Sequence, residues 1–432
     1  MKITNVFAYQ IYDSRGYPTV ACEVTIDDKY KGLAFVPSGA STGEKEAVEL
    51  RDKISKDWMG KGVENPIRNV NEIIKPKLIG LNPLNQNEID QLMIELDSTD
   101  NKSNLGANAI LAVSLANAKA AANALNLELY QYIRQNLLNS ESKEFFSVLP
   151  LVNVINGGQH ANNNLDFQEF MFVPLQPKTW TQTLKIVSEC FLSLQNILKT
   201  SKKSIAKGDE GGFSIDFNKV EDVFELLINS IKDAGYVPGV DVGFALDVAA
   251  SEFYNDGYYY VNIDNQKTKL SSNELMQWYI KLIESYPIVS IEDPFDENDW
   301  QTFAKFNQLV GDKIQIVGDD LYCTNYKLLE KGINLKATNA ILIKLNQIGT
   351  LTESLKTIEL AQRNNINVVV SHRSGETEDT FIADLAIAVN AKEIKTGSMS
   401  RSERLAKYNR ITYIDHNEKN KLVIPSWKEL IK

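Results

Sequence analysis

The last two thirds of the chain repeats one pattern, a short apolar run that ends in a polar or charged residue. The runs read VGFALD, IVSIEDP, IQIVGDD, AILIKLN, NVVVSHR and EIKTGS. Amphipathic segments separate most of them, and two of these open with capping boxes, Ser271 to Glu274 and Thr350 to Glu353. Strands that alternate with helices predict parallel βαβ units and an α/β fold.

The residues that end these runs are spaced like successive units of a (β/α)8 barrel, in which about 250 residues make eight strands. They are Asp247, Glu292, Asp319, Lys344, His372 and Lys395. A barrel collects the carboxyl ends of its strands on one face, where its active site lies. We therefore expect these six side chains to converge on one pocket. A doubly wound sheet is the alternative, and it would not bring all six together.

The first third predicts a smaller α+β domain. Residues 20–26 (VACEVTI) alternate like a half-buried strand, the DSRGYPT before them has hairpin-turn chemistry, and YKGLAFVP predicts a further strand. Apolar residues recur along one face of a helix from Ala107 to about Asn126. The pattern decays into a linker between Gln135 and Ser147, so we predict an N-terminal domain over 1–138 and a barrel domain over 146–432.

The composition excludes several classes of function. A net charge of -10 argues against nonspecific binding to nucleic acid or to an anionic membrane, so an anionic substrate needs a local positive pocket or a metal. The three cysteines include no CxxC pair, which suits a reducing compartment. Polar residues interrupt the longest apolar stretch, and the N-terminus has no apolar run of signal-peptide length. We expect a cytoplasmic protein with no direct nucleic-acid or membrane partner.

Three of the strand ends are carboxylates. Asp247, Glu292 and Asp319 offer hard oxygen ligands from three adjacent strands, which suits Mg²⁺. Any one of them could instead cap a helix or form a surface ion pair. Their occurrence at successive strand ends favours a metal site.

The basic residues near the strand ends suggest a base and an anion clamp. Lys344 and Lys395 follow apolar runs, so they are expected to be partly buried. Buried lysines usually snorkel or pair, but near a metal and a second ammonium a lysine loses its proton more easily and becomes a usable base. Arg373 and Ser374 supply donors for a phosphate or carboxylate. A satisfied core position is the bland alternative for His372.

Two more stretches fit the same pocket. VINGGQHANNNLDFQEFM places His160 after a glycine pair, and Gln168 and Glu169 in an alternating strand. KGDEGGF places Asp209 and Glu210 between glycines, where a turn could present a carboxylic acid to substrate. Alone, such a turn is most often only a turn.

Metal, a lysine base, carboxylic acids and an anion clamp suit one type of reaction. Removing a proton α to a carboxylate creates a doubly charged ene-diolate, which metal ions on the substrate carboxylate stabilise. A carboxylic acid on the opposite side could protonate a departing hydroxide. The residues therefore favour a β-elimination of water.

The motifs resemble those of the enolases over essentially the whole chain. The matching stretches are DSRGYPTV, PSGASTGEKEA, NKSNLGANAILAVS, INGGQHANN, FQEFM, GDEGGF, LDVAASEF, SIEDPF, GDDL, LIKLNQIGT, SHRSGETED and IKTGSMSRSER. The resemblance implies a small N-terminal domain on an enolase-type barrel with two leading strands before regular βα alternation. Enolase-superfamily sites are themselves a standard example of a lysine or histidine base paired with one or two Mg²⁺.

The resemblance also implies roles for individual residues. Asp247, Glu292 and Asp319 match the ligands of a first Mg²⁺, Lys344 the base, and Glu210 the acid. The remaining matches are Glu169 beside the acid, Gln168 and Lys395 as substrate-binding residues, Arg373 and Ser374 as the phosphate clamp, His160 and His372 in the loop and pocket, and Ser41 in a mobile loop that helps to hold a second Mg²⁺ recruited with substrate.

The implied activity is the interconversion of 2-phosphoglycerate and phosphoenolpyruvate in glycolysis and gluconeogenesis, by a homo-dimer or octamer. Another role is plasminogen binding at the cell surface or partnership in RNA-degrading assemblies, as for some family members. The terminal Lys432 suits plasminogen binding, although an ordinary solvated terminus is the better interpretation. A divergent enzyme acting on another acid is disfavoured by the HRS clamp and the complete GDEGG turn.

The chain departs from the family pattern at four positions. Tyr17 stands where Asn is usual, and Ser98 and Ala112 stand where Gly is usual. Lys207, before GDEGG, is uncommon. We expect the Lys207 side chain to point into solvent and to alter the acidity of Glu210 only modestly.

Overall fold

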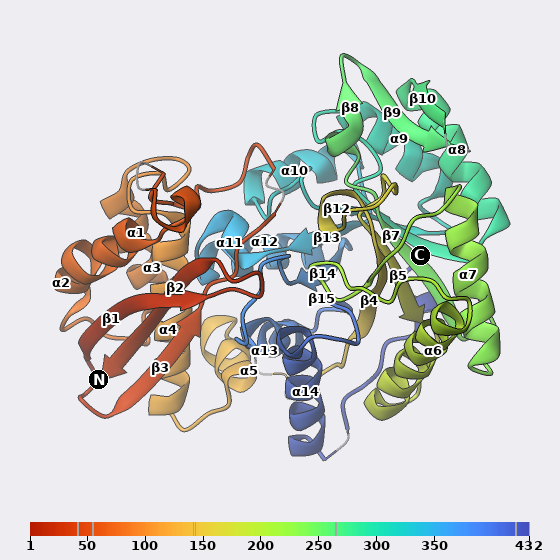
Figure 1. The fold of residues 1–432 in the computed structure, drawn as a ribbon. Helices are drawn as coiled ribbons and strands as arrows, with labels where there is room; N and C mark the ends of the chain where they lie inside the picture. The colour runs from red at the N-terminus through yellow and green to blue at the C-terminus, as the bar shows by residue number, and fades with distance from the viewer. Residues whose placement is uncertain are drawn as a thin grey trace.

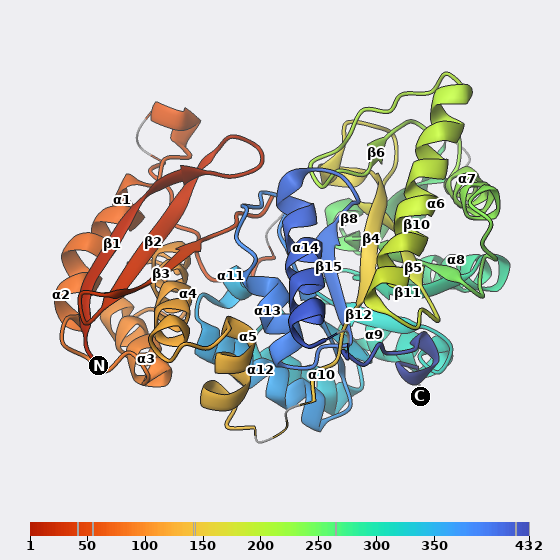
Figure 2. The ribbon, with the colours of Figure 1, turned by 90° about the horizontal axis from the view of Figure 1, so that it is seen from below.

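The computed structural model describes residues 1–40, 43–53, 56–140, 142, 144–263, 266–419 and 421–431. They form a small N-terminal unit and a larger barrel that lie side by side, with the two chain ends on opposite sides of the molecule (Figures 1 and 2). No helix in the described ranges combines the length and apolar character needed to cross a membrane.

The N-terminal unit is an antiparallel three-stranded sheet covered by helices. Its strands are β1 (Ile3–Tyr12), β2 (Pro18–Ile26) and β3 (Tyr30–Phe35), paired in that order. Its helices are η1 (Asp57–Gly60), α1 (Glu64–Arg68), η2 (Asn69–Ile74), α2 (Lys75–Leu78), α3 (Gln86–Asp97), α4 (Ala107–Ala124), α5 (Leu129–Tyr132) and η3 (Ile133–Leu137). The predicted strands, turn and long helix are confirmed.

Helix α4 packs directly on β2 and β3. Gly32 permits this approach, because a Cβ there would lie 2.2 Å from the carbonyl oxygen of Ala116 and from the amide nitrogen of Ala120. The helix is therefore part of the core of this unit, and most of its residues are buried.

Eight strands of the second unit close into a barrel, as the spacing predicted. In spatial order they are β4 (Leu149–Asn156), β5 (Glu169–Pro174), β7 (Val242–Asp247), β11 (Ile288–Glu292), β12 (Gln315–Gly318), β13 (Ala340–Ile343), β14 (Asn367–Ser371) and β15 (Glu393–Gly397), and β15 pairs with β4. The short β6 (Phe213–Ser214) pairs with β4 from outside this ring.

One strand differs from the parallel arrangement that the repeating pattern predicted. Strand β5 runs antiparallel to both β4 and β7. Its first residue, Glu169, therefore lies opposite Asp247, the last residue of β7. This reversal brings the start of β5 to the face where the other strands end, which agrees with the two leading strands implied by the family resemblance.

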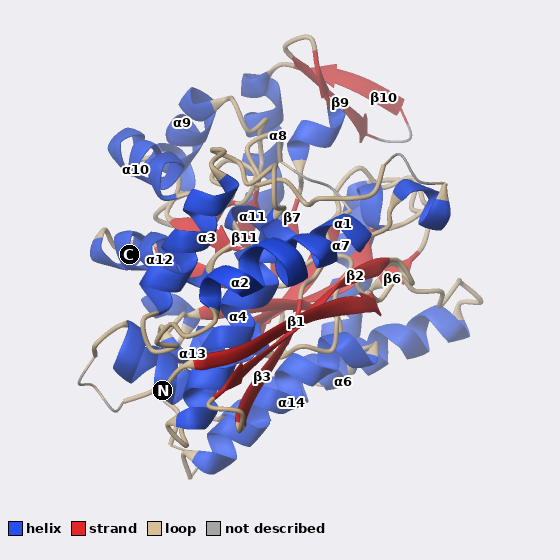
Figure 3. Cartoon of the chain, turned by 90° about the vertical axis from the view of Figure 1, so that its left-hand side faces the viewer, coloured by secondary structure: helices blue, strands red, loops and turns tan. Residues whose placement is uncertain are grey.

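Helices surround the barrel (Figure 1). They are α6 (Trp180–Thr200), α7 (Val220–Asp233), α8 (Ser272–Ser285), α9 (Trp300–Val310), α10 (Tyr326–Leu335), α11 (Leu345–Ile348), α12 (Leu351–Arg363), α13 (Phe381–Ala388) and α14 (Ser402–Asn417), with the short turns η4 (Gly158–His160), η5 (Ala250–Phe253) and η6 (Trp427–Glu429). A separate sheet of β8 (Tyr254–Asn255), β9 (Tyr258–Ile263) and β10 (Gln266–Leu270) includes a hairpin at the edge of the molecule (Figure 3).

The two predicted capping boxes start helices α8 and α12. At Ser271 the box is complete, with the side chains of Ser271 and Glu274 each accepting a backbone N–H from the other residue. At Thr350 the hydroxyl accepts the N–H of Glu353 at 3.1 Å, which is one of the two hydrogen bonds of a capping box.

The amino-terminal end of the barrel holds a buried carboxylic acid. Glu393, at the start of β15, accepts one hydrogen bond, from the Gln315 side chain at 2.9 Å, and its other oxygen has no partner among the described residues. Asn367 donates to Gln315 and to the carbonyl of Leu430, which ties the C-terminal segment to this end of the barrel. Burial raises the pKa of Glu393 to about 8, because one neutral donor does not replace water around a carboxylate.

This acid should make the folded state sensitive to alkaline pH. A group whose pKa is raised on folding contributes stability that is present at low pH and is lost as the pH rises through the folded-state pKa. Between pH 7 and 9 the Glu393 contribution should fall by about 1 kcal/mol. Urea unfolding of wild type and Glu393→Gln across this range checks it, since the amide variant should lack this part of the slope. Equal slopes for the two proteins would contradict an acid buried in its neutral form.

Candidate active site

The six predicted strand-end residues are brought together at the carboxyl-terminal face of the barrel. Five of them line one buried pocket: Asp247, Asp319, Lys344, His372 and Lys395. The sixth, Glu292, contacts Lys395 and is itself buried. The pocket is also lined by His160, Gln168, Glu169, Glu210, Arg373 and Ser374.

Lys395 is the cationic centre of one half of this pocket. Its Nζ lies 2.9 Å from Asp247 Oδ2, 2.9 Å from Glu292 Oε2 and 3.2 Å from Glu169 Oε1. Burial lowers the pKa of Lys395, but these carboxylates outweigh burial and hold it well above its ordinary value. The charged form of Lys395 is therefore favoured, which suits the binding of an anion.

Lys344 is paired with a carboxylate rather than free. Its ammonium donates to Asp319, whose other oxygen accepts from the Gln347 side chain at 2.8 Å. Burial lowers the pKa of Lys344, but Asp319 outweighs it and raises the pKa above its ordinary value. The lysine is thus protonated while Asp319 remains its partner.

Asp319 also belongs to a cluster of carboxylates that the sequence analysis did not single out. Oxygens of Asp293, Asp319 and Asp320 lie within 4.8 Å of one another. The buried Asp293 accepts the N–H groups of Asp319 and Asp320 at 2.9 and 2.7 Å. Asp293 directly follows the predicted ligand Glu292 in IEDP, and Asp320 directly follows Asp319 in GDD. This adjacency in the sequence could have pointed to both residues.

The acidic side of the pocket suits a hard divalent cation. Among the residues that the structure describes, the predicted trio Asp247, Glu292 and Asp319 is not gathered within 4.8 Å. Lys395 contacts both Asp247 and Glu292, whereas Asp319 pairs with Lys344. Glu292 Oε1 is nevertheless buried without a hydrogen-bond partner, and burial and Asp247 raise the pKa of Glu292 well above its ordinary value. Buried oxygens short of positive charge are the donors that Mg²⁺ prefers.

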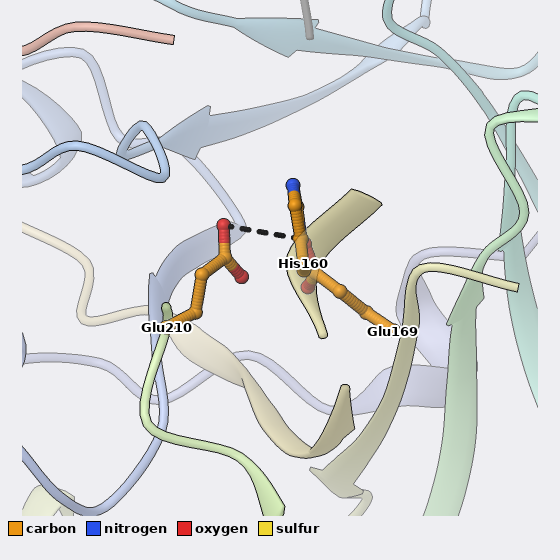
Figure 4. Close-up of side chains that lie close together, drawn as sticks. All are labelled: His160, Glu169 and Glu210. Carbon is orange, nitrogen blue, oxygen red and sulfur yellow. Dashed lines mark ion pairs between the residues drawn. The ribbon is translucent and has the colours of Figure 1, made fainter. Parts of the chain in front are cut away.

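A second group places one histidine between two carboxylates (Figure 4). His160 Nδ1 lies 3.5 Å from Glu169 Oε1 and 3.6 Å from Glu210 Oε1. The antiparallel β5 brings Glu169 here, and the adjacent Gln168 donates its backbone N–H to the Asp247 carbonyl. Asn153, on β4, donates to Glu210 Oε2 at 2.9 Å. Asn153 was not predicted, because nothing distinguishes it from other polar residues of a strand.

The protons of this group are unevenly shared. Burial lowers the pKa of His160, but Glu210 and Glu169 outweigh it and raise the pKa. Burial and the charge of Glu210 raise the pKa of Glu169 to about 7. Burial also acts to raise the pKa of Glu210, yet nearby cations such as His160 and Arg404 hold it well below its ordinary value. The protonated form is therefore favoured on Glu169 and the ionised form on Glu210.

Arg404, on α14, fixes the other histidine. The guanidinium contacts His372 Nδ1 and donates to the carbonyls of Arg373 and Ser374, each at 2.6 Å. Because arginine can only donate, His372 Nδ1 is an acceptor and its Nε2–H faces Glu210 Oε2 at 3.6 Å. Burial keeps the pKa of His372 well below its ordinary value. Arg404 lies in the RSER stretch quoted above, but its role depends on long-range contacts.

The predicted anion clamp carries an internal anion. Arg373 donates to both carboxylate oxygens of Glu46, at 3.0 and 3.2 Å, and to the Asn346 side chain at 3.1 Å. The Ser374 hydroxyl accepts the N–H of Ala40 at 2.7 Å. The segment around the predicted loop thus rests on the clamp, while Ser41 itself lies outside the described residues. Glu46 was not predicted.

Three of the family departures have local structural explanations. The Tyr17 ring lies in the turn after β1, with Lys61 Nζ 4.2 Å from its centroid. Ser98 ends α3 at φ 60°, a conformation that costs a residue with a Cβ about 1 kcal/mol. Ala112 is buried within α4, where alanine is a better helix former than glycine.

The fourth departure corrects an expectation. The Lys207 side chain does not point into solvent. Its Nζ is buried and lies 3.2 Å from the Phe213 ring centroid.

Comparisons with known proteins agree with the motif resemblance. Residues 3–133 match the family model described as the enolase N-terminal domain, and residues 145–424 match the enolase C-terminal TIM barrel domain. The chain is 54% identical over 423 residues to the enolase of Mycoplasma pneumoniae, covering 96% of this chain and 93% of that protein. It is 53% identical over 431 residues to the enolase of Ureaplasma parvum serovar 3, covering 98% of both.

Each unit of the fold has its own family match, and the relatives are covered over nearly their full length. The pocket contains the carboxylates, lysines, histidines and clamp residues of the quoted motifs. The chain belongs to the enolase family, the hydro-lyases that interconvert 2-phosphoglycerate and phosphoenolpyruvate.

Proposed function

We propose that the chain dehydrates 2-phosphoglycerate reversibly to phosphoenolpyruvate with Lys344 as the base and Glu210 as the acid. The observation that carries this proposal is that both groups line one buried pocket but are held by separate partners. Lys344 contacts Asp319, whereas Glu210 contacts Asn153 and lies near two histidines. An elimination needs its base and its acid to be held independently in this way.

Enolase membership implies Mg²⁺, and we propose that Asp247, Glu292 and Asp319 hold a first ion. A second would be recruited with substrate, with the help of Ser41. The buried, partnerless oxygen of Glu292 supports this assignment. When bound, Mg²⁺ would neutralise negative charge on the substrate carboxylate and so favour loss of the neighbouring proton.

Lys344 would become a base if Asp319 held Mg²⁺ in place of the lysine ammonium. Without this partner, burial lowers the lysine pKa, and the charges of Arg373 and Lys395 act in the same direction. The neutral amine then takes the proton α to the substrate carboxylate. Lys395 and Gln168 would bind the substrate.

Glu210 must be protonated to assist loss of the hydroxyl. In the substrate-free site burial and the charge of Glu210 raise the pKa of Glu169 to about 7, and His160 lies between the two carboxyl groups. We propose that His160 passes a proton from Glu169 to Glu210 when substrate occupies the pocket. His372 offers its Nε2–H to Glu210 on the other side.

The phosphate group of the substrate would occupy the clamp of Arg373 and Ser374. Both side chains are buried and border the pocket, and the guanidinium already binds a carboxylate in two-point fashion. A phosphate has the same geometry with more charge, so it is a stronger partner for Arg373 than Glu46.

The test is to separate the two proton transfers with Glu210→Gln. The variant should still exchange the C2 hydrogen of 2-phosphoglycerate with deuterium from solvent, because Lys344 is intact, while dehydration falls about 100-fold or more. Proton NMR follows the exchange, and ultraviolet absorbance follows phosphoenolpyruvate. Glu225→Gln, an exposed change of the same type on α7, is the control. Wild-type dehydration by Glu210→Gln would refute the acid assignment.

The remaining assignments are also proposals. We propose domains over 1–138 and 146–432, a cytoplasmic location, and assembly into a homo-dimer or octamer. Phe7 and Tyr12, 50% and 53% exposed on β1, support an interface on the N-terminal sheet. Plasminogen binding at the cell surface is the weaker candidate, and Lys432 lies outside the described residues.

A further inference from the structure

The acid Glu210 is presented by a small hairpin over residues 206–214. The N–H of Ser214 donates to the Ala206 carbonyl at 2.9 Å, and the N–H of Gly208 donates to the Gly212 carbonyl at 2.8 Å. Lys207 and Phe213 pair across the base as an antiparallel bridge. The position of Glu210 at the tip therefore depends on how this base is anchored.

Lys207 provides an unusual anchor. Its Nζ lies 3.2 Å from the ring centroid of Phe213 and 4.2 Å from that of Phe191. The atom is buried and has no hydrogen-bond partner among the described residues. A lysine ammonium over an aromatic face is attracted by the ring, and more strongly when desolvated. The two rings are thus the principal partners of this charge.

The rings connect the hairpin to the body of the barrel. Phe191 belongs to α6, Phe213 belongs to β6, and the two rings stack with centroids 5.2 Å apart. Phe213 also pairs with Ile155 of β4. Lys207 therefore fastens the incoming strand of the hairpin to α6 and to the returning strand β6, which itself pairs with the barrel strand β4.

The contacts near the tip come from another segment. The Arg401 side chain donates to the Gly208 carbonyl at 3.0 Å, and the Ser400 hydroxyl donates to the Gly211 carbonyl at 2.6 Å. These bonds hold the turn from the side of α14, and Lys207 holds it from the side of α6.

A direct electrostatic effect on Glu210 is not the main role of Lys207. The groups that lower the pKa of Glu210 are His160, His372, Arg404 and Lys395. Lys207 is not among them, so a modest effect on the acidity of Glu210 remains the expectation. Its influence on catalysis must then act through geometry.

We propose that Lys207 is a positioning residue that holds the hairpin over residues 206–214, and with it the carboxyl of Glu210, by contacting the rings of Phe191 and Phe213. This inference rests on the proposed role of Glu210 as the acid. It deepens that role by naming what fixes the acid in place.

The test compares steady-state kinetics of Lys207→Met, Lys207→Arg and a control. Assays at pH 6.5 favour the charged ammonium, since burial and the charge of Arg401 lower the pKa of Lys207 to about 7. Lys207→Met should lower kcat about 10-fold, as expected when a reacting group is displaced by a fraction of an ångström, with KM for 2-phosphoglycerate unchanged. Lys207→Arg should restore most of kcat, because it keeps a cation on the rings.

Lys203→Met is the matched control. Lys203 lies over Phe217 at 5.2 Å, but it is exposed and precedes the hairpin. The control should keep wild-type kcat. Phe213→Leu should lower kcat like Lys207→Met, and the double variant should show little further loss, since both changes break one contact. Should Lys207→Met fail to fold, Lys207→Gln carries the same comparison.

Wild-type kcat for Lys207→Met, or a loss that Lys207→Arg does not restore, would overturn the inference. An effect confined to KM would overturn it too. These outcomes are separable from failure of the proposed function, because Glu210→Gln is assayed in parallel. If Glu210→Gln still dehydrates 2-phosphoglycerate, the assignment of Glu210 as the acid is refuted. If Glu210→Gln is inactive while Lys207→Met has wild-type kcat, only the positioning role of Lys207 is refuted.

Discussion

Replacing Lys344 with alanine should reduce the conversion of 2-phosphoglycerate about 10²- to 10⁴-fold, the range that a positioned base contributes. The side chain lines the pocket, and among the described residues its ammonium donates to Asp319, so the substitution removes one side-chain contact along with the proposed base. Ultraviolet absorbance of phosphoenolpyruvate measures the loss. Unlike Glu210→Gln, this variant should also lose the exchange of the C2 hydrogen with solvent.

Two comparisons make this result specific. Lys327→Ala removes an exposed lysine near the start of α10 and should leave turnover unchanged. Chelation of Mg²⁺ should stop wild-type turnover, and added Mg²⁺ should restore it. Turnover of Lys344→Ala within about tenfold of wild type would assign the base to another residue, because a missing base costs at least a hundredfold.

Replacing Arg404 with methionine should lower the free energy of unfolding by at least about 3 kcal/mol, since buried carbonyl oxygens would lose charged donors. The guanidinium is fully buried and donates to the carbonyls of Arg373, Ser374 and Asp209. Methionine fills similar volume but supplies no donor. Urea unfolding of the purified variant measures the loss.

The matched change is Arg363→Met at the end of α12. Arg363 pairs with Glu359 one helical turn away in solvent, and such pairs contribute less than about 0.5 kcal/mol. Near-equal destabilisation by the two substitutions would show that burial of Arg404 does not matter. Activity gives a second readout, because Arg404→Met removes the partner of His372 Nδ1 and should lower kcat in whatever protein remains folded.

The positions of the strand-end residues could be predicted because the information is local. An apolar run followed by a polar residue specifies a buried strand and its end, and barrel geometry then brings such ends to one face. Lys344 and His372 needed no further information to be placed in the pocket. The same argument predicted a pocket position for Glu292. In the structure Glu292 contacts Lys395, which lines the pocket, but does not line the pocket itself.

The direction of β5 could not be predicted from its own residues. The run FMFVP is buried throughout and carries no sign of direction. The connection from β4 was the only available hint, because it holds one short turn, η4, whereas a parallel crossover normally contains a full helix. This direction decides whether Glu169 lies beside Asp247 or at the far end of the barrel.

The sequence also could not predict which side chains pair with one another inside the pocket. Arg373 and Glu46 are 327 positions apart, and Arg404 contacts His372 from α14, beyond the intervening α13 and β15. Spacing along a chain predicts neighbours within one helix or strand, but it does not predict which charges meet after folding. Lys207 is a similar case, since its partners, two aromatic rings, lie on separate elements.

The ion pair between Glu46 and Arg373 has a consequence for the departure of ligands. Glu46 is tethered beside the clamp by its own N-terminal unit, so it acts as a competitor at a high and constant local concentration. In the proposed binding of phosphate by Arg373, the Glu46 carboxylate would take the place of a departing anion, because it cannot diffuse away. The guanidinium would then stay paired after product leaves, and the protein itself would oppose rebinding of product.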